Sequence, residues 1–109
     1  MTETYEIPTV SMVSRVRAAL HEVIDPELGV NIGDLGLIYA VFVDDDTNDV
    51  TVRMTLTTPG CPMSDSIQKG VKFRLSMIEG IGEVTIDLVF DPRWNPGKMS
   101  ERCKAKLWR

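Results

Sequence analysis

The sequence is short of the residues that several common kinds of site require. It has two cysteines and one histidine among 109 residues, and two cysteines at unrelated spacings match neither a disulfide framework nor a zinc finger. It contains no glycine-rich phosphate loop, nucleophile elbow or HExxH pattern. The N-terminus lacks the basic and apolar regions of a signal peptide, and the longest apolar run, 37–43, is far too short to span a bilayer. We therefore expect a cytoplasmic protein with reduced thiols and no membrane association.

Basic residues are scarce in the first half of the chain. The net charge is -4 and the isoelectric point is about 4.9, which argues against a nucleic-acid-binding protein because such proteins normally have a basic face. Residues 1–60 contain three Lys/Arg and ten Asp/Glu, whereas residues 61–109 contain nine and six. The basic bias of the second half favours an acidic partner, although the solvated sides of two helices would give the same bias.

The periodicity of apolar residues predicts one domain over 1–109, with 1–10 as a flexible N-terminal segment. We predict a helix over 11–24, an irregular stretch over 25–36, strands over 37–43, 50–57 and 84–90, a helix over 63–78 and a last short helix from 95. This order indicates an α+β fold, a two-layer sandwich with a three-stranded sheet and the helices packed on one face. The unbroken apolar run 37–43 is typical of a central strand that is covered on both sides.

The expected topology brings distant loops to one edge of the sheet. The turn 44–49 makes its two flanking strands antiparallel, and pairing about its centre places Gly36 near Thr57. The helix that follows returns the chain along the sheet, so the third strand should run parallel to the second and end at the same edge. We therefore expect the loops around residues 25–27, 34, 59–61 and 91–94 to surround one point.

Cys61 lies at that point, in the sequence TTPGCP between a strand pattern and a helix pattern. Pro62 suits the first helical position, which puts Cys61 at or near the N-cap. Unpaired amide groups and the helix dipole favour negative charge there, so a thiolate forms more easily, although the nearby Asp65 partly opposes the effect. We therefore predict a functional thiol, the alternative being a small, inert, buried side chain.

The surrounding residues have structural alternatives to a functional role. Asp25 precedes a proline and Asp34 is followed closely by a glycine, so both are candidates for a site or for holding a loop. The hydroxyl groups of Thr57 and Thr58 either donate hydrogen bonds to a thiolate or belong to ordinary strand residues. Gly60 is expected in a tight turn where the backbone approaches whatever binds the sulfur.

Three further residues also have structural interpretations. Trp94 is either an anchor for a partner or a cap over the core. Cys103 shares a helical stripe with other apolar residues and is predicted to pack in the core. His21 is expected at the surface, and one histidine cannot form a histidine-rich metal site.

Four ordered motifs resemble the MIP18 family, formerly a domain of unknown function, which includes SufT-type and PaaD-like proteins. They are DPE at 25–27, DLGLIY at 34–39, TTPGCP at 57–62 and DPRWNP at 91–96, the last followed by Met99 and Ser100. The resemblance implies a small α+β fold shared with other cluster-assembly domains, and a role in the assembly or delivery of iron-sulfur clusters. It implies that Cys61 is the family's cysteine, surrounded by Asp25, Glu27, Asp34, Thr57 and Trp94. Arg93 and the tail from Cys103 onward depart from the family pattern.

The leading hypothesis is a non-enzymatic accessory factor that serves iron-sulfur assembly machinery and client apoproteins, with Cys61 as a transient contact for iron or a cluster. Clusters usually take four cysteines, so a partner, a second copy of this chain or a carboxylate would complete the ligand shell. One alternative is a small thiol enzyme with Cys61 as nucleophile, assisted by Asp25 or Asp34. Another is a structural adaptor that binds through Trp94 and the basic last helix. An unpaired edge strand and shared ligation make a homodimer a reasonable expectation.

Overall fold

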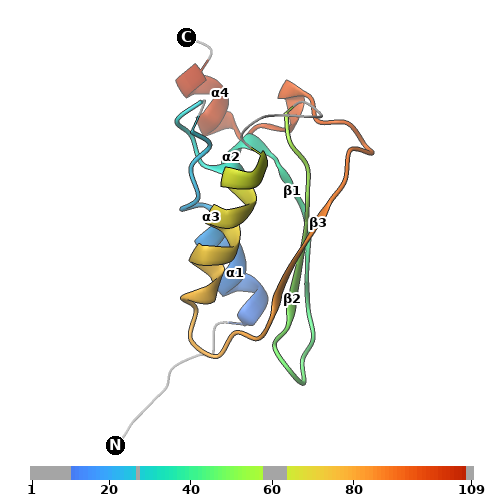
Figure 1. Cartoon of the computed structure of the whole chain (residues 1–109). Coiled ribbons are helices and arrows are strands. Elements are labelled where there is room, and N and C mark those ends of the chain that lie inside the picture. The colour runs from blue at the N-terminus through green and yellow to red at the C-terminus, as the bar shows by residue number, and fades with distance from the viewer. Residues whose placement is uncertain (1–10, 27, 58–63, 108–109) are drawn as a thin grey trace, which may run out of the picture.

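The computed structural model describes residues 11–26, 28–57 and 64–107. In chain order the elements are α1 (Met12–Leu20), α2 (Ile32–Leu35), β1 (Ile38–Val43), β2 (Val50–Met54), α3 (Ser64–Ser76), β3 (Val84–Leu88), the 3-10 helix η1 (Pro96–Lys98) and α4 (Glu101–Leu107). The helices lie on one side of a three-stranded sheet (Figure 1), which confirms the predicted α+β class. Within the described residues, no helix combines the length and apolar character needed to cross a membrane.

The strand order is β1-β2-β3, with β1 antiparallel to β2 and β2 parallel to β3. The parallel pairing of the last two strands is as predicted. The prediction that residues 37–43 form the central strand is wrong, because β1 lies at an edge and β2 is central. The apolar run continues on the uncovered face, where Phe42 is 49% exposed and its ring lies 5.1 Å from the Arg53 guanidinium carbon. The aromatic ring thus shares that face with a cation. The sequence of β1 is typical of a strand covered on both faces, although only one face of β1 is covered.

A bulge interrupts the pairing at the start of β1. The register pairs Phe42 with Thr51 and Ala40 with Arg53, and then shifts so that Ile38 faces Met54. The extra residue is Tyr39, whose hydroxyl donates a hydrogen bond to the Pro92 carbonyl at 2.7 Å. Bulges of this kind redirect a side chain, and here the side chain ties the first strand to the segment that follows the third.

The bulge also changes which residues face one another at this end of the sheet. The Thr55 amide donates to the Leu37 carbonyl at 2.9 Å. Continuing that pairing places Gly36 opposite Leu56, one residue from the expected partner Thr57.

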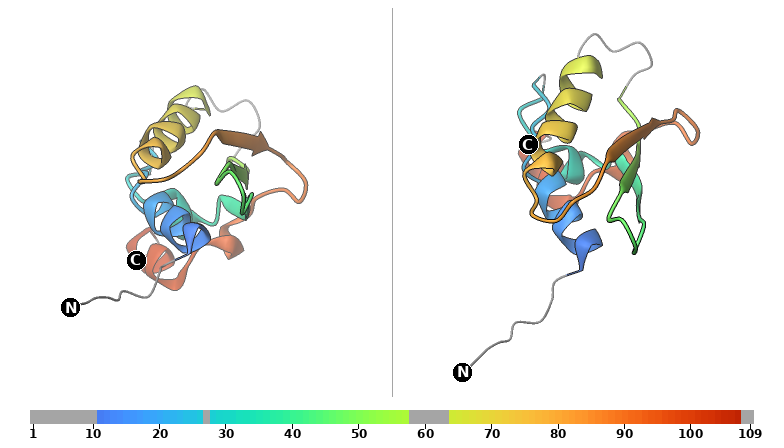
Figure 2. Two further views of the ribbon diagram at one scale, coloured as in Figure 1. Left: turned by 90° about the horizontal axis from the view of Figure 1, so that it is seen from below. Right: turned by 60° about the horizontal axis from the view of Figure 1, so that its bottom comes forward.

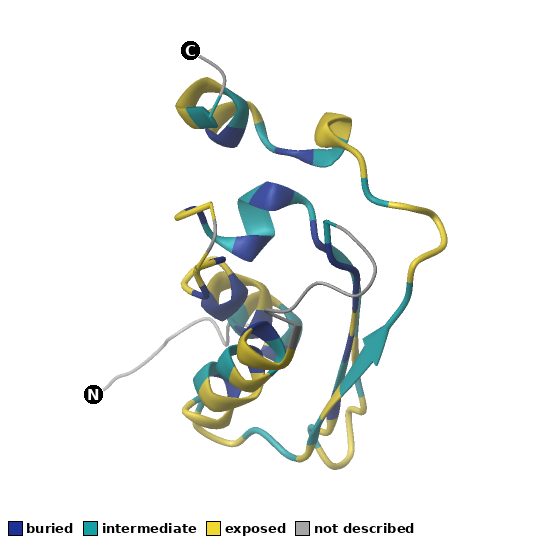
Figure 3. Cartoon of the chain, turned by 45° about the horizontal axis from the view of Figure 1, so that its top comes forward, coloured by how far each residue is buried: buried dark blue, intermediate teal, exposed yellow. Residues whose placement is uncertain are grey.

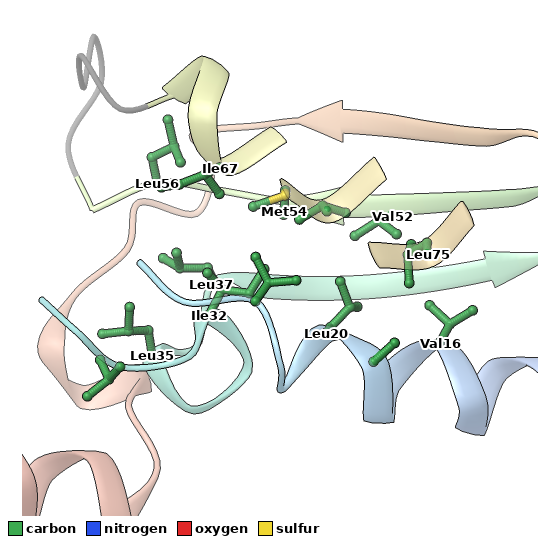
Figure 4. Packing of buried hydrophobic residues seen from close by; sticks show 14 of the residues in the cluster. Val16, Leu20, Ile32, Leu35, Leu37, Val52, Met54, Leu56, Ile67 and Leu75 are labelled. Atoms are coloured by element: carbon green, nitrogen blue, oxygen red, sulfur yellow. The ribbon is translucent and has the colours of Figure 1, made fainter. Parts of the chain in front are cut away.

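The core lies between the sheet and the two longer helices. Helices α1 and α3 lie side by side against the sheet when the molecule is seen along its length (Figure 2). Buried residues line the inner surfaces of both layers (Figure 3), and side chains from α1, α2, α3 and the strands meet there (Figure 4). The fully buried members are Val16, Leu20, Ile32, Leu35, Leu37, Val50, Val52, Met54, Val71 and Leu75.

Helix α1 is shorter than predicted. The expected helix reached residue 24, but α1 ends at Leu20 with His21 as its C-cap. The backbone of the following residues pairs across a turn instead, with the Asp25 amide donating to the Val30 carbonyl and the Ile32 amide to the Val23 carbonyl, both at 2.9 Å. Pro26 disfavours helical geometry only at Asp25, directly before it, and the earlier end of α1 accompanies this pairing across the turn, which includes a bridge between Ile24 and Asn31.

The stretch 25–36, predicted as irregular, contains the short helix α2. Asn31 caps its start by accepting from the Asp34 amide at 2.7 Å, and Gly36 ends it in the left-handed region at φ 81°. Asn before and Gly after a helix are recognised boundary signals. A helix of four residues is too short to produce an apolar periodicity, which is why pattern analysis missed it.

The last helix predicted from residue 95 is two elements. Asn95 caps η1, and Met99 then adopts an extended conformation with ψ 149°. Ser100 starts the second helix, because its hydroxyl accepts from the Cys103 amide at 3.1 Å. Met99 and Cys103 are both buried, at 6% and 2% exposed, so the predicted packing of Cys103 is confirmed, whereas Met99 lies between the two helices and not on a shared helical stripe.

Charge is divided between the two ends of the molecule. The turn between β1 and β2 carries four aspartates, Asp44, Asp45, Asp46 and Asp49. Helix α4 carries Arg102, Lys104 and Lys106 and one acidic residue, Glu101. The turn and α4 lie at opposite ends of the sheet (Figure 1), so one end is acidic and the other is rich in basic side chains.

Candidate functional site

The candidate site is the end of the molecule where β2 and β3 finish and β1 begins. Because β2 and β3 are parallel, the segments after both strands meet at this end, as expected. Helix α2 and the beginning of α3 lie there too (Figure 1). Thr57, which follows β2, is half-buried at this end.

Four of the predicted site residues lie outside the described residues: Glu27, Thr58, Gly60 and Cys61. The proposed roles of these residues therefore remain predictions. The described residues show how the neighbouring loops are held, through Asp25, Asp34, Thr57 and Trp94.

Asp25 is a buried carboxylate, 3% exposed, that organises the turn after α1. Its Oδ1 accepts from the Leu28 amide at 3.2 Å, and its backbone carbonyl accepts from the Gly29 amide at 2.8 Å. The side chain thus forms the kind of local turn in which Asp substitutes for a backbone acceptor. This geometry supports the loop-holding interpretation of Asp25.

Asp34 connects α2 with α4. Its Oδ2 accepts from Arg102 Nη2 at 2.9 Å and from Asn31 Nδ2 at 2.8 Å, while its backbone carbonyl accepts from the Ser100 amide at 2.7 Å. The hydrogen bonds from Arg102 and Asn31 lower the pKa of the carboxyl group below its ordinary value, although partial burial acts in the opposite direction. Asp34 is therefore an ionised, already paired carboxylate. Sequence reasoning did not identify Arg102 as its partner, because no local spacing links residues on two separate helices.

The ion pair predicts a pH dependence of stability. Because the folded carboxyl group binds a proton less tightly than the unfolded one, its contribution is complete above the unfolded pKa of about 3.9 and is lost as the pH falls through the folded value. Asp34→Asn should lower the free energy of unfolding by about 1 kcal/mol at pH 7, since Arg102 is solvent-exposed and the pair is screened. The deficit should shrink as the pH is lowered towards 3, as measured by urea denaturation at several pH values.

The matched control is Asp87→Asn, because Asp87 pairs with Arg53 in an ion pair that is exposed on both sides, with side-chain exposures of 46% for Arg53 and 42% for Asp87. Exposed pairs of this kind contribute little, so this variant should remain close to the native protein at every pH. An Asp34→Asn deficit that persists unchanged at pH 3 would contradict the assignment of the effect to charge.

Trp94 is fixed to α2 rather than left free at the surface. Its indole Nε1 donates to the Leu35 carbonyl at 2.7 Å, and its ring packs against the core as a half-buried side chain. A buried tryptophan N–H usually finds such a partner. This arrangement supports the core-capping interpretation of Trp94 and holds the segment after β3 over α2.

Among the cavities that the described residues line at this end, two are the larger. One, of about 340 Å³, is lined by residues of the loop after α1 and of α4, including Asn31, Asp34 and Cys103. The other, of about 550 Å³, lies on the uncovered face of the sheet and includes Tyr39 and Lys98 in its lining.

Cys103 has the features of a packing residue. It is 2% exposed, and burial together with the charge of Asp34 raises the pKa of its thiol. A thiol in this state is a poor metal ligand, since the thiolate is the form that binds. Among the described residues there is no group of three or more His, Cys, Asp or Glu side chains placed to hold a metal ion.

Together these features define a small α+β domain whose loops converge at the end of a mixed three-stranded sheet. Comparison with known families places it further: the chain belongs to the iron-sulfur cluster assembly protein family, whose model matches residues 14–88. The matched range contains Asp25, Asp34 and Cys61 but ends before Trp94 and α4.

Individual relatives agree with this placement. The chain is 48% identical over 88 residues to an Fe-S protein maturation auxiliary factor of Porphyromonas gingivalis, a match covering 81% of this chain and 83% of the relative. It is 46% identical over 85 residues to the Fe-S protein maturation auxiliary factor SufT of Staphylococcus aureus, covering 78% and 96%. A crystal structure of a domain of unknown function from Bacillus anthracis superposes with a TM-score of 0.85 at 39% identity, covering 88% of this chain and 91% of that one.

Proposed function

We propose that this protein is an accessory factor that assembles iron-sulfur clusters or delivers them to client apoproteins, with the Cys61 thiolate as a transient contact for iron or the cluster. The proposal rests first on the 48% sequence identity between this chain and an Fe-S protein maturation auxiliary factor, over 81% of this chain. The iron or cluster is cargo in this scheme, and the assembly machinery and client apoproteins are the partners.

The position of Cys61 in the chain supports a reactive thiol. Helix α3 begins at Ser64, three residues further along the sequence, and thiols near helix starts commonly have a lowered pKa. A single cysteine leaves most of the ligand positions of a cluster to other molecules. Shared ligation of this kind suits a factor that releases its cargo.

The described carboxylates favour this proposal over a thiol enzyme. An enzyme would need a base beside the thiol, and the candidates were Asp25 and Asp34. Asp34 is ion-paired with Arg102, which lowers its pKa and makes it a weaker base. Asp25 accepts a hydrogen bond from the Leu28 amide within a turn. Both carboxylates therefore already have structural roles.

The proposal is tested by replacing Cys61 with serine in cells that depend on this protein. We expect the activity of a cluster-requiring client enzyme to fall while the amount of its apoprotein stays constant, because serine cannot provide a soft thiolate ligand. The purified variant should also lose the visible absorption that the native protein gains when it is reconstituted anaerobically with iron and sulfide.

Cys103→Ser is the matched control, since it makes the same atomic change at a buried thiol. It should retain the absorption signal per folded molecule, even where it lowers stability. Full client activity with Cys61→Ser would remove the sulfur from the mechanism. Turnover of a small substrate that depends on Cys61 would favour the enzyme instead.

A further inference from the structure

The outer edge of β1 has unpaired backbone groups. Among the described residues β1 pairs with β2 alone, and hydrogen bonds in an antiparallel pair come from alternate residues. The Asp44 amide bonds the Asp49 carbonyl at 2.9 Å just beyond the strand, so Phe42 and Ala40 are the residues that bond to β2. The amide and carbonyl groups of Val41 therefore point away from the sheet, as do those of Val43.

This edge lacks most of the features that prevent strands from pairing with other chains. Natural edge strands are commonly protected by charged side chains, proline or a bulge. β1 has the sequence IYAVFV, with no charge and no proline, and its bulge lies at one end, near Tyr39. The opposite edge, β3, carries Asp87, which is paired with Arg53 at 2.9 Å. The two edges thus differ, and β1 is the one suited to accept another strand.

We propose that β1 pairs antiparallel with β1 of a second copy of this chain, about a two-fold axis at Val41, to give a continuous sheet across a homodimer. The register keeps each side chain on its own face of the sheet. On the uncovered face it sets the half-exposed ring of Phe42 beside the small side chain of Ala40 in the second copy. The outward backbone groups of Val41 in the two copies bond to one another.

Charge complementarity favours a second copy as the occupant. In this register Asp44, the first residue after β1, lies opposite Ile38 of the second copy, so the turn that carries Asp46 lies beside the beginning of that copy's β1, which Gly36 precedes. Gly36 and Ile38 line the cavity of about 550 Å³ that also includes Lys98. The acidic turn of each copy therefore meets a lysine of the other, and the two-fold axis makes this contact twice.

The charges at this contact have no ion-pair partner in the part of the chain that the structure describes. The Lys98 ammonium lies 5.0 Å from the centroid of the Tyr39 ring and makes no ion pair among the described residues, and the same holds for the carboxylate of Asp46. The cavity lining also contains Arg53 and Asp91. Arg53 is already paired with Asp87, so Lys98 is the cation available to the incoming turn.

The first test compares Val41→Pro with Ile86→Pro by sedimentation equilibrium. Proline is tolerated where an amide points away from the sheet. Ile86 is the corresponding position on β3. The Val50 amide bonds the Glu83 carbonyl and the Val89 amide bonds the Met54 carbonyl, so odd-numbered residues of β3 bond to β2 and the Ile86 amide points away from the sheet. The native protein should be a dimer in the micromolar range. Val41→Pro should weaken the dimer roughly 30-fold, since it removes two backbone hydrogen bonds by symmetry, and Ile86→Pro should leave it unchanged.

A charge exchange keeps the proposal testable if a proline variant does not fold. Asp46→Lys and Lys98→Glu should each weaken the dimer roughly tenfold, and the protein carrying both changes should recover it. A native protein that stays monomeric at about 100 micromolar, a concentration at which a pair with a Kd of about 1 micromolar is mostly dimeric, would overturn the proposal. A folded Val41→Pro protein that stays dimeric, or a double charge variant that shows no recovery, would do the same.

Discussion

Replacing Gly36 with alanine is expected to lower the free energy of unfolding by about 3 kcal/mol or more. Gly36 ends α2 at φ 81°, a conformation that costs an L-residue about 1–2 kcal/mol. A Cβ atom there would also meet the Lys98 backbone carbonyl group, whose carbon would lie at 2.7 Å. A backbone group cannot move aside as a flexible side chain can, so η1 would have to leave α2. Thermal or urea denaturation measures the loss.

Gly29 and Gly80 are matched controls for this prediction. Both have positive φ, at 72° and 85°, and an added Cβ would have no atom within 4 Å. Alanine at either position should therefore lower the free energy of unfolding by about 1–2 kcal/mol, which is the cost of holding an L-residue in the left-handed conformation. If Gly36→Ala costs no more than the controls, the close approach of η1 to α2 is not a constraint on the fold.

Leu35→Ala is expected to have the second large effect, a loss of about 2–5 kcal/mol. Leu35 is fully buried in α2, beneath the segment that Trp94 holds in place. Removing its side chain leaves a cavity that cannot close easily, because the Leu35 carbonyl remains bonded to the Trp94 indole at 2.7 Å. The cavity should therefore persist, and the measured loss in urea denaturation should lie towards the upper part of that range.

Leu28→Ala makes the same chemical change at an exposed position of the adjoining loop. Leu28 is 41% exposed and the substitution should cost less than about 1 kcal/mol. Equal losses for the two leucines would mean that α2 does not contribute to the cooperative core. A large loss at Leu35 alone shows that the candidate site rests on the same core as the sheet.

The sheet was predictable where one physical signal dominated. Alternation of apolar and polar residues identified β2, and the helix that returns the chain along the sheet fixed the direction of β3. The same reasoning misplaced β1 at the centre of the sheet, because Phe42 occupies the uncovered face near the cation of Arg53. Hydrophobic sequence alone does not distinguish an aromatic side chain on such a face from a buried one.

The sequence predicted which loops meet at the candidate site, but it did not predict the side-chain hydrogen bonds that hold them. Topology placed the segments after β2 and β3 together, and turn chemistry suggested the role now seen for Asp25. The bond between Asp34 and Arg102 joins residues 68 positions apart, in α2 and in a terminal helix whose packing no local pattern determines. The same limit applied to the hydrogen bond between Tyr39 and Pro92, which depends on the bulge in β1.

The division of charge between the aspartate turn and α4 gives a single molecule an electric dipole along the sheet. At low ionic strength such a dipole orients a charged protein before contact, so an acidic partner would arrive first at the end that carries α4 and the candidate site. This electrostatic steering raises the association rate, and it weakens at physiological salt, where the Debye length falls to about 8 Å. In an antiparallel pair the two dipoles cancel, and self-association would then adjust how quickly the site is found.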